Sequence, residues 1–357
     1  MELIPEWAPN IHPLLVHFPI GIIILAALMN FISLFIPEEW WDEKKNTIIY
    51  IVGSVSAIGV YYSGKSAADS VFLPTEAQTV LNNHADWALW LVWFFIAYAI
   101  VRIGLHYFKL FEKSITKYLA FVAVLPGIFL LYETGEHGAE MVFGYGAGTG
   151  QLLEQEEVSP DLTDSNPASS ESSFTQKENG DWFWEMNENA VTDLIGNFHW
   201  TEGSVNELNP EVVASNSTQY LKLSINEGSN TFVTHNNYQN VQVDYYIDMT
   251  DLDGDLMLIH HFIDNENFDY VQLKSSGIII QGRKEQGENN VFQEGKFETG
   301  GVQFFRVVGN GTHFRGYINK EMAVHGHGDA PESGSVGLRI EGEGSILISK
   351  IELSQLK

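Results

Sequence analysis

The stretch IHPLLVHFPIGIIILAALMNFISLFI, residues 11–36, decides the fold of the first half of this chain. It has two histidines, but no acidic residue, lysine or arginine occurs between Glu6 and Glu38. A helix of about 20 apolar residues is long enough to cross a bilayer. Residues 13–36 therefore predict a membrane-spanning helix.

Three more apolar segments follow, at residues 47–63, 85–108 and 115–132. The first of them is rich in small residues that allow close helix contact, and the next contains the aromatic run WALWLVWFFIAY. The last contains Pro126-Gly127, where we expect a kink. The four segments together predict a four-helix transmembrane bundle over residues 1–143.

Basic residues indicate how this bundle is oriented, because they favour the cytoplasmic side of a membrane. Only Lys65 lies on the side of the chain termini. Six flank the two short loops on the other side: Lys44, Lys45, Arg102, Lys109, Lys113 and Lys117. We therefore expect both termini and the 64–83 loop outside a bacterial cytoplasmic membrane, with the first helix retained and not cleaved as a signal peptide.

Four histidines fall on the outer side of this topology: His12, His17, His84 and His137. Neutral imidazole is the commonest metal ligand and the usual axial ligand of haem iron. His12 and His17 are five residues apart, about 140° around a helix, so they are not expected to face one centre. We rank His17, His84 and His137 as metal ligands ahead of His12.

Three carboxylates near these histidines are candidates to orient the imidazoles through their second nitrogen: Asp86, Glu133 and Glu136. Solvated side chains at a membrane interface are the alternative interpretation. A haem b or another histidine-bound transition metal would suit such a cluster.

The motifs IHPLLVHFPIG, NNHADWALW and GEHGAEMVFGYGAG resemble the bacterial membrane-protein family DUF2231, over residues 8–150. Members are often fused to c-type cytochrome or Rieske-like modules, so the resemblance implies a redox setting and b-type haem. Tyr145 stands where many members have a histidine. The chain has no cysteine, which rules out iron–sulfur clusters and covalently attached haem held by its own thiols.

Residues 144–180 are rich in Ser, Glu, Asp, Pro and Asn, and predict a flexible acidic linker. Residues 181–357 contain short alternating runs such as VQVDYYIDM, separated by turns such as DLDGD. This pattern predicts an all-β antiparallel sandwich. The expected fold is therefore an α + β multidomain chain, a helical bundle followed by a β-domain.

The segments HFIDNENFDYVQLKSSG, FRVVGNGTHFRGYINKEMAVHG and SGSVGLRIEGEGSILISKIEL resemble a concanavalin A-like jelly roll, in its LamG and DUF1080 branches. The 250–255 stretch is read as a turn and not a calcium loop, since an EF-hand needs Glu where Phe262 stands. Neither a glycosidase E-x-D-x-x-E pattern nor a G-x-S-x-G elbow occurs, which favours a non-enzymatic role.

Two histidine pairs and one aromatic set remain candidates in the β-domain. Strand alternation would send His260 and His261 to opposite faces, and His325 and His327 are expected in a flexible loop. The aromatic residues are either a sugar-stacking platform or core: Trp182, Trp184, Phe268, Tyr270 and Phe314.

Charge is divided unevenly between the two halves. Residues 1–150 carry seven Lys/Arg against thirteen Asp/Glu, a net charge of −6, and residues 151–357 carry twelve against thirty-three, a net charge of −21. Nucleic-acid binding needs clustered basic residues and is disfavoured. The leading hypothesis is a membrane haem or metal protein that exchanges electrons with a periplasmic partner. The alternative is a non-redox cell-envelope protein that binds carbohydrate.

Overall fold

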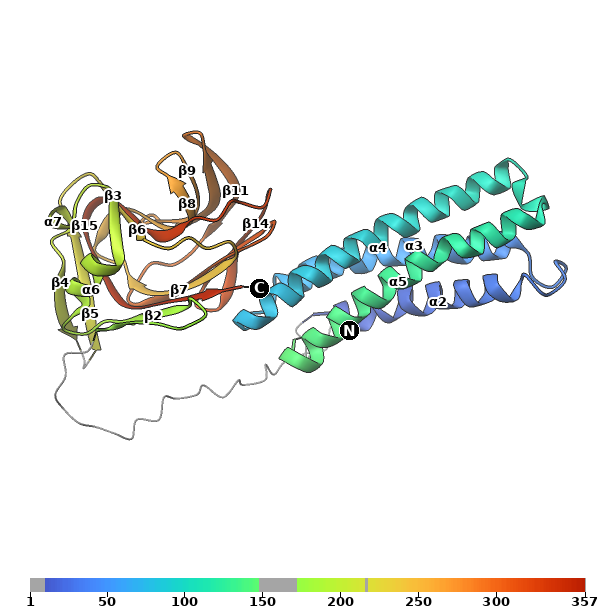
Figure 1. The fold of residues 1–357 in the computed structure, drawn as a ribbon, viewed down its shortest axis with the longest axis horizontal. Helices are drawn as coiled ribbons and strands as arrows, with labels where there is room; N and C mark the ends of the chain where they lie inside the picture. Colours follow the sequence, from blue (N-terminus) through green and yellow to red (C-terminus); the bar gives the residue numbers. More distant parts are fainter. Residues whose placement is uncertain (1–9, 148–171, 216–217, 357) are drawn as a thin grey trace. The chain divides into compact units, whose positions relative to one another are not determined.

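The computed structural model describes every residue except 1–9, 148–171, 216–217 and 357. The chain divides into two compact units, Met1–Gln155 and Glu156–Lys357. The first is helical and the second is built almost entirely of strands, as Figure 1 shows.

The helical unit is an up-and-down bundle. Its elements are α1 (His12–Leu15), α2 (His17–Ile32), α3 (Glu43–Ala68), α4 (Thr75–Tyr107), the short 3-10 helix η1 (Leu110–Glu112) and α5 (Ser114–Tyr145). Four helical segments are long and apolar enough to cross a membrane: His12–Ile32, Glu43–Ala68, Thr75–Tyr107 and Ser114–Tyr145. The expected four-helix transmembrane bundle is confirmed.

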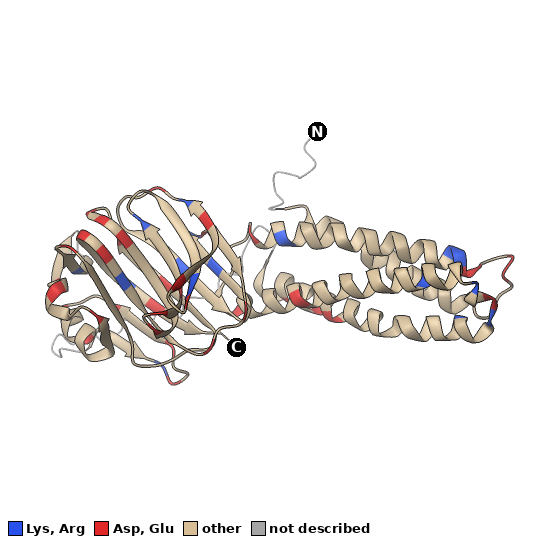
Figure 2. Cartoon of the chain, turned by 90° about the horizontal axis from the view of Figure 1, so that it is seen from above, with Lys and Arg blue, Asp and Glu red and all other residues tan. Residues whose placement is uncertain are grey.

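The outward surface of the bundle is apolar. Leu28, Trp93 and Ile100 are 53%, 61% and 63% exposed, which in water would be costly for so many large side chains. Figure 2 shows the middle of each helix almost free of charge, with acidic and basic residues gathered toward the helix ends. A surface of this kind is suited to hydrocarbon.

The helices are longer than the apolar segments that predicted them. Helix α3 starts at Glu43, where the side chain of Asp42 accepts a hydrogen bond from the Lys45 N–H at 2.8 Å. Only residues 69–74 connect α3 to α4, so the expected 64–83 loop is wrong. Helix α5 continues to Tyr145, through Pro126, and ends at Gly146 with φ of 69°. Hydropathy marks the apolar stretch, but the hydrogen-bonded helix extends beyond it.

The β-unit has fifteen strands among the described residues, with short helices α6 (Ala190–Asn197) and α7 (Val205–Leu208). The strands are β1 (Phe174–Gln176), β2 (Trp182–Glu185), β3 (Phe198–Glu202), β4 (Glu211–Ser215), β5 (Thr218–Ile225), β6 (Ser229–Thr234), β7 (Val241–Asp248), β8 (Leu252–Asp264), β9 (Asn267–Lys274), β10 (Ile278–Glu285), β11 (Glu288–Lys296), β12 (Gln303–Asn310), β13 (His313–Ile318), β14 (Glu321–His327) and β15 (Ser335–Gln355). The sandwich thus begins at β1, earlier than residue 181.

Strand order along the main path is β11-β10-β9-β8-β15-β7-β12-β13-β14, and the pairs are antiparallel. The long strand β15 belongs to both layers: its first half pairs with β6 and β8, and its second half with β7, β5 and β2. At the change of partner, Gly344 has φ of 123°, and a Cβ there would collide with the backbone oxygen of Asp251. Only glycine suits this crossing.

One large apolar core fills the space between the layers, from Trp184, Leu223 and Val307 in the layer of β2, β5, β7 and β12 to Leu258 and Ile340 in the layer of β8. Every second residue of most strands points into it, as strand geometry requires. The expected antiparallel sandwich is confirmed. The stretch Thr250–Asp251 forms the turn between β7 and β8, where Asp248 Oδ1 accepts a hydrogen bond from the Thr250 N–H at 2.9 Å.

Candidate functional site

His12 and His84 come together at one end of the bundle, which we call the histidine end. Their ring centroids are 6.4 Å apart and the rings meet edge to face. Two glycines let the neighbouring helices close on them: a Cβ on Gly64 of α3 would lie 3.0 Å from His12, and one on Gly138 of α5 would lie 3.1 Å from His84. The two rings therefore sit between closely packed helices.

Hydrogen bonds fix which nitrogen of each ring carries the proton. His12 Nδ1 lies 2.9 Å from Ser63 Oγ, whose own hydrogen goes to the Val60 carbonyl at 2.8 Å, so the ring donates to the hydroxyl. His84 Nδ1 lies 2.9 Å from the Thr134 carbonyl, which can only accept. In neutral rings Nε2 is then the atom with a lone pair, as in metal-binding histidines oriented through Nδ1.

His137 lies in α5, not after it. Its Nδ1 donates to the Glu133 carbonyl at 2.8 Å, and its ring stacks on Trp87 with centroids 6.5 Å apart. Glu133, Glu136 and His137 can bring one ligand atom each to within 4.8 Å of one another. We expected carboxylates to orient these imidazoles, and for the Nδ1 atoms this is wrong. The Nδ1 atoms of His12, His84 and His137 bond one hydroxyl and two main-chain carbonyls instead.

His17 does not join this group. It starts α2 with an exposed side chain, whereas His12 lies against α3. Neither the set with His17, nor the set His12, His84 and His137, is among the groups of three ligand atoms within 4.8 Å in the described part of the chain. The structure therefore places His12, and not His17, next to His84. The two point apart as expected, but α1 turns His12 inward.

Tyr145, which replaces a histidine expected from the family resemblance, is a packing residue. It contacts a small apolar cluster of Leu73, Ala77 and Leu81 at the histidine end. Its ring closes the end of α5 against the start of α4. In this chain the side chain at position 145 therefore contributes to apolar packing.

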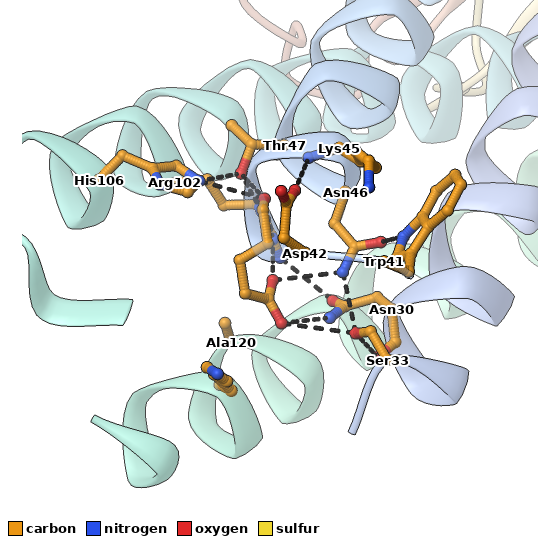
Figure 3. Close-up of polar contacts among 12 residues, drawn as sticks. Asn30, Ser33, Trp41, Asp42, Lys45, Asn46, Thr47, Arg102, His106 and Ala120 are labelled. Carbon is orange, nitrogen blue, oxygen red and sulfur yellow. Dashed lines mark hydrogen bonds and ion pairs between the residues drawn. The ribbon is translucent and has the colours of Figure 1, made fainter. Parts of the chain in front are cut away.

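The opposite end of the bundle, called here the arginine end, holds a buried charged network that the sequence did not reveal (Figure 3). Arg102 of α4 is fully buried and forms an ion pair with Glu43, which is 6% exposed. The same guanidinium donates to Thr47 Oγ1 at 3.0 Å and to Asn30 Oδ1 at 3.1 Å. Arg102 was counted as a loop-flanking cation, and that assignment is wrong.

The network connects all four long helices. Arg102 Nη1 also donates to Tyr98 Oη at 3.1 Å, and that hydroxyl donates to the Ala120 carbonyl of α5 at 2.7 Å. His106 Nε2 lies 2.9 Å from Thr47 Oγ1 and 3.1 Å from the Glu43 carbonyl. Buried charges in a bundle are tolerated when paired and hydrogen-bonded in this way. We infer that this network holds the four helices together at the arginine end.

The outer face of the β-unit carries a groove of about 600 Å³ on strands β2, β15, β7 and β5. Register places Glu185, Lys350 and Tyr246 in one row across three strands. Phe304 of β12 continues the row beside Tyr246, with ring centroids 5.3 Å apart. The lining residues are Ser173, Phe183, Glu185, Met186, Asn187, Thr218, Gln219, Tyr246, Ser349 and Lys350.

Two half-buried rings and a cation define the chemistry of this groove. Lys350 Nζ lies 4.6 Å from the Phe183 ring centroid and 5.6 Å from that of Tyr246. The ammonium is also 3.3 Å from Glu352 Oε2. Apolar ring faces and several polar groups therefore meet in one concave surface, the usual composition of a small-ligand site.

Of the two interpretations of the aromatic set, core residues are confirmed and a sugar-stacking platform is wrong. Trp182, Trp184, Phe268, Tyr270 and Phe314 are all at most 5% exposed. Alternation decides this, because Trp182 and Trp184 share the inward face of β2 while Phe183 between them faces out. The outward aromatic residues are Phe183, Tyr246 and Phe304, which composition alone does not distinguish.

His260 and His261 lie side by side, contrary to strand alternation. His261 has φ of 52°, at a register shift in the β8–β9 pairing, and the two Nδ1 atoms are 2.8 Å apart. Asp269 Oδ2 is 3.4 Å from His261 Nδ1, and Arg283 binds both oxygens of Asp269 at 2.5 and 3.1 Å. The local left-handed backbone is what brings both rings to the same side.

Burial sets the charge state of this cluster. Burial, and next the neighbouring His261, lower the pKa of His260 to about 3. Burial on its own would raise the pKa of Asp269, but hydrogen bonds from His261 and Arg283 outweigh it and hold the pKa at about 2. At neutral pH the cluster therefore contains a neutral His260 beside an ionised Asp269–Arg283 pair.

Comparison with protein families identifies the helical unit. Residues 8–151 match the family described as "Predicted membrane protein (DUF2231)". The helical half matches the DUF2231 family. The match confirms the resemblance seen in the sequence and covers less than half of the chain, so the β-unit lies outside it. A search of curated proteins found no match.

Three of the solved structures similar to this chain match less than or about half of its length. The carbohydrate-binding module CBM66 of Bacillus subtilis is 12% identical, over 43% of this chain and 94% of that one, with a TM-score of 0.35. The β-glucanase of Bacillus licheniformis is 10% identical, over 50% and 100%, with a TM-score of 0.38. A Bacillus subtilis protein of unknown function with a galectin-like fold is 10% identical, over 47% and 92%, with a TM-score of 0.37.

The helical unit thus has polar groups at both ends. The sequence indicates the histidine end clearly and the arginine end only weakly. The His-Pro and His-Phe-Pro motifs indicate the histidine end from the sequence. Arg102 and Glu43 are 59 residues apart, each at the border of an apolar segment. In the sequence, only the isolated Arg102 near the end of a long apolar segment indicates a buried charge. The packing of the helices then shows that Glu43 is its ion-pair partner.

Proposed function

We propose that this membrane protein holds a glycan-binding sandwich at the outer surface of the cell membrane, with the DUF2231 domain as its membrane unit. One observation carries the proposal: the concave groove of β2, β15, β7 and β5, with Phe183 and Tyr246 turned outward around Lys350.

The lining groups match the surface of a sugar ring. A pyranose has an apolar C–H face and a rim of hydroxyls. Rings such as Phe183 and Tyr246 offer flat apolar faces. Glu185, Gln219 and Lys350 offer acceptors and donors around them. Such a combination binds by stacking and fixes orientation by hydrogen bonds.

Charge narrows the class of glycan. Residues 151–357 carry a net charge of −21, which repels polyanions. Lys350 is itself paired with Glu352 and is therefore not a strong site for a sulfate or a uronate. We infer that neutral glycans are the ligands.

The test measures binding of the full chain in detergent to immobilised neutral and polyanionic glycans. We expect selective retention on a neutral glycan, with affinity at least about tenfold weaker in Tyr246→Ala and in Phe183→Ala, equal to ~1.4 kcal/mol. Ile263→Ala is the control, since Ile263 is an exposed apolar residue outside the groove. Absence of retention, or equal retention of all variants, would refute the proposal.

We also propose that the arginine end faces the cytoplasm of a bacterial cytoplasmic membrane, with both termini outside. Removing the buried Arg102 from the count leaves five lysines near that end, Lys44, Lys45, Lys109, Lys113 and Lys117, against Lys65 at the other. The bias toward the cytoplasm remains.

A second candidate function belongs to the histidine end. There His12 and His84 lie close together, and the Nδ1–H group of each ring donates a hydrogen bond to a protein oxygen. We propose that these two, with His137 beside them, bind a transition metal or a haem b for electron exchange with an extracytoplasmic partner. The oriented Nε2 atoms suit either group, and a bound group would supply the redox chemistry.

This second proposal is tested by the visible spectrum of the protein, oxidised and reduced, and by its metal content. We expect a signal that is lost in His84→Ala and in His12→Ala and retained in His17→Ala, because His17 faces outward. A colourless preparation whose iron, copper and zinc content is the same in the wild-type chain and in His84→Ala would overturn it.

A further inference from the structure

The hairpin of β13 and β14 brings three histidines together on one face of the β-unit. His313 pairs directly with His327, and His325 lies two residues before His327 on the same strand. Residues opposite each other, and residues two apart, share a face of a sheet. The pattern His-x-His on one strand, with a third histidine across from it, therefore places all three rings on one side.

The rings are within reach of one ion. Centroids of His325 and His327 are 4.5 Å apart, those of His313 and His327 are 4.8 Å apart, and those of His313 and His325 are 6.3 Å apart. One nitrogen from each ring lies within 4.8 Å of the other two. We propose that these residues form a site for a divalent transition metal, Zn²⁺ in the first instance.

The distances need only a small closure to bind zinc. Zn²⁺–N bonds of about 2.0–2.1 Å at tetrahedral angles separate two ligand nitrogens by roughly 3.3 Å. Side-chain rotations of the exposed His327 and the half-buried His325 can supply the difference. The exposure of His327 also gives the ion a way in.

The backbone under the site is held from the other face. Gly326 separates the two β14 histidines, and a Cβ there would collide with the Phe292 ring at 2.7 Å. The His325 N–H donates to Gln293 Oε1 of β11 at 2.6 Å. Strand β14 is thereby fixed to β11, so the three imidazoles sit on a rigid hairpin and not on the flexible loop expected from sequence.

Ligand chemistry selects the metal. Three imidazoles are borderline-soft nitrogen donors, which suit zinc, copper and nickel and are poor ligands for Ca²⁺ and Mg²⁺. Three protein ligands leave a fourth position for water or an anion. Arg315, opposite His325 on the same face, opposes a bare dication and favours an anionic fourth ligand.

The site is independent of the proposed glycan groove and of the histidine end. His313, His325 and His327 do not line the groove, and they belong to the β-unit, whereas His12 and His84 belong to the helical unit. Variants can therefore separate the three proposals.

The test uses the full chain in detergent, stripped with a chelator and titrated with Zn²⁺ by calorimetry. We expect a tight site that persists when His12 and His84 are both replaced, and at least about a 100-fold loss of its affinity in His325→Ala/His327→Ala. His12→Ala/His84→Ala and His199→Ala/His235→Ala serve as controls and should keep that site. The second control removes another stacked histidine pair of the β-unit, with centroids 5.2 Å apart.

A spectroscopic measurement keeps the test decisive if a variant is unstable. Co²⁺ substituted into the wild-type chain should show the visible absorption of a tetrahedral, nitrogen-bound ion. The single variant His327→Gln, at an exposed position, should shift it. Failure of the wild-type chain to bind Zn²⁺, or equal binding by the double variant, would overturn the proposal.

Discussion

Arg102 is the residue on which the interior of the bundle depends. Its charge lies among apolar helices, where an unpaired ion is costly, and Glu43, Thr47, Asn30 and Tyr98 surround its guanidinium. Breaking such a pair leaves the other charge buried and unpaired.

We expect Arg102→Ala to lower the free energy of unfolding by roughly 3–5 kcal/mol, because Glu43 then stays buried without a partner. Thermal unfolding of the detergent-solubilised chain, followed by circular dichroism, measures this. Lys44→Ala is the matched control, since Lys44 is an exposed cation on α3, and should change little. Equal behaviour of the two variants would show that the ion pair does not clamp the bundle.

His260 and Asp269 make the stability of the β-unit sensitive to acid. The pKa of His260 is lowered to about 3 from 6.5, so between these values the unfolded chain binds a proton that the folded one does not. The pKa of Asp269 is lowered to about 2 from 3.8, so its contribution is present above pH 4 and is lost as the pH falls toward 2.

We therefore expect the free energy of unfolding of residues 172–357 to fall by up to roughly 1.4 kcal/mol per pH unit from pH 6.5 downward, as one more proton binds on unfolding. Chemical denaturation at a series of pH values measures the slope. His260→Gln should flatten it, and His235→Gln, at an exposed position, should not. An unchanged slope in His260→Gln would exclude this histidine as its source.

Among the elements, helix α5 shows how small residues position its neighbours. Gly127 follows Pro126 inside the helix, and a Cβ at Gly127 would collide with the rings of Phe94 and Phe95 of α4. Gly135 lies two turns later in the same helix with open space around it. The same helix therefore offers a contact glycine and a free one.

We expect Gly127→Ala to destabilise the bundle by about 1–3 kcal/mol through overpacking. Gly135→Ala should be neutral or stabilise it by up to about 1 kcal/mol, since alanine is the better helix former. Thermal unfolding of both variants in one detergent makes the comparison. Similar shifts for the two would mean that α4 and α5 are not tightly packed at Gly127.

Strands illustrate the same limit of sequence reasoning. Alternation in WFWE of β2 established that Trp182 and Trp184 share one face, but it did not say which face is inward. The packing of the core shows that Trp182 and Trp184 face inward, so that Phe183 faces outward and lines the groove. In β8 a left-handed His261 broke the alternation altogether.

At the scale of the whole molecule, the chain combines a helical unit that matches the DUF2231 family with a β-sandwich, as two compact units. The absence of cysteine makes topology directly measurable. Any introduced thiol is then the single reactive one.

We expect Glu227→Cys, exposed in the sandwich, to react with a membrane-impermeant maleimide in intact spheroplasts. Glu39→Cys, exposed between α2 and α3, should react only after permeabilisation. Labelling is read by gel shift, and each variant is its own control after lysis. The reverse pattern would invert the proposed orientation.

Much of the architecture was predictable from local pattern. Apolar length predicted four spans, alternation predicted the sandwich, and the topology placed His12 and His84 among four histidines on one side of the membrane. The partners were not predictable. Ser63, Thr134 and Glu43 meet their histidines and arginine across 50 to 60 residues of chain, and no spacing in the sequence encodes such a contact.

The sequence by itself determined what each segment must bury or expose, because hydrophobic periodicity acts locally and follows the helix or strand repeat. Only the tertiary structure decided which polar side chains are in contact. It places His12, and not His17, beside His84, pairs Arg102 with Glu43, and groups His313 with His325 and His327. These contacts depend on helix rotation and strand register, which are set by packing of the whole unit.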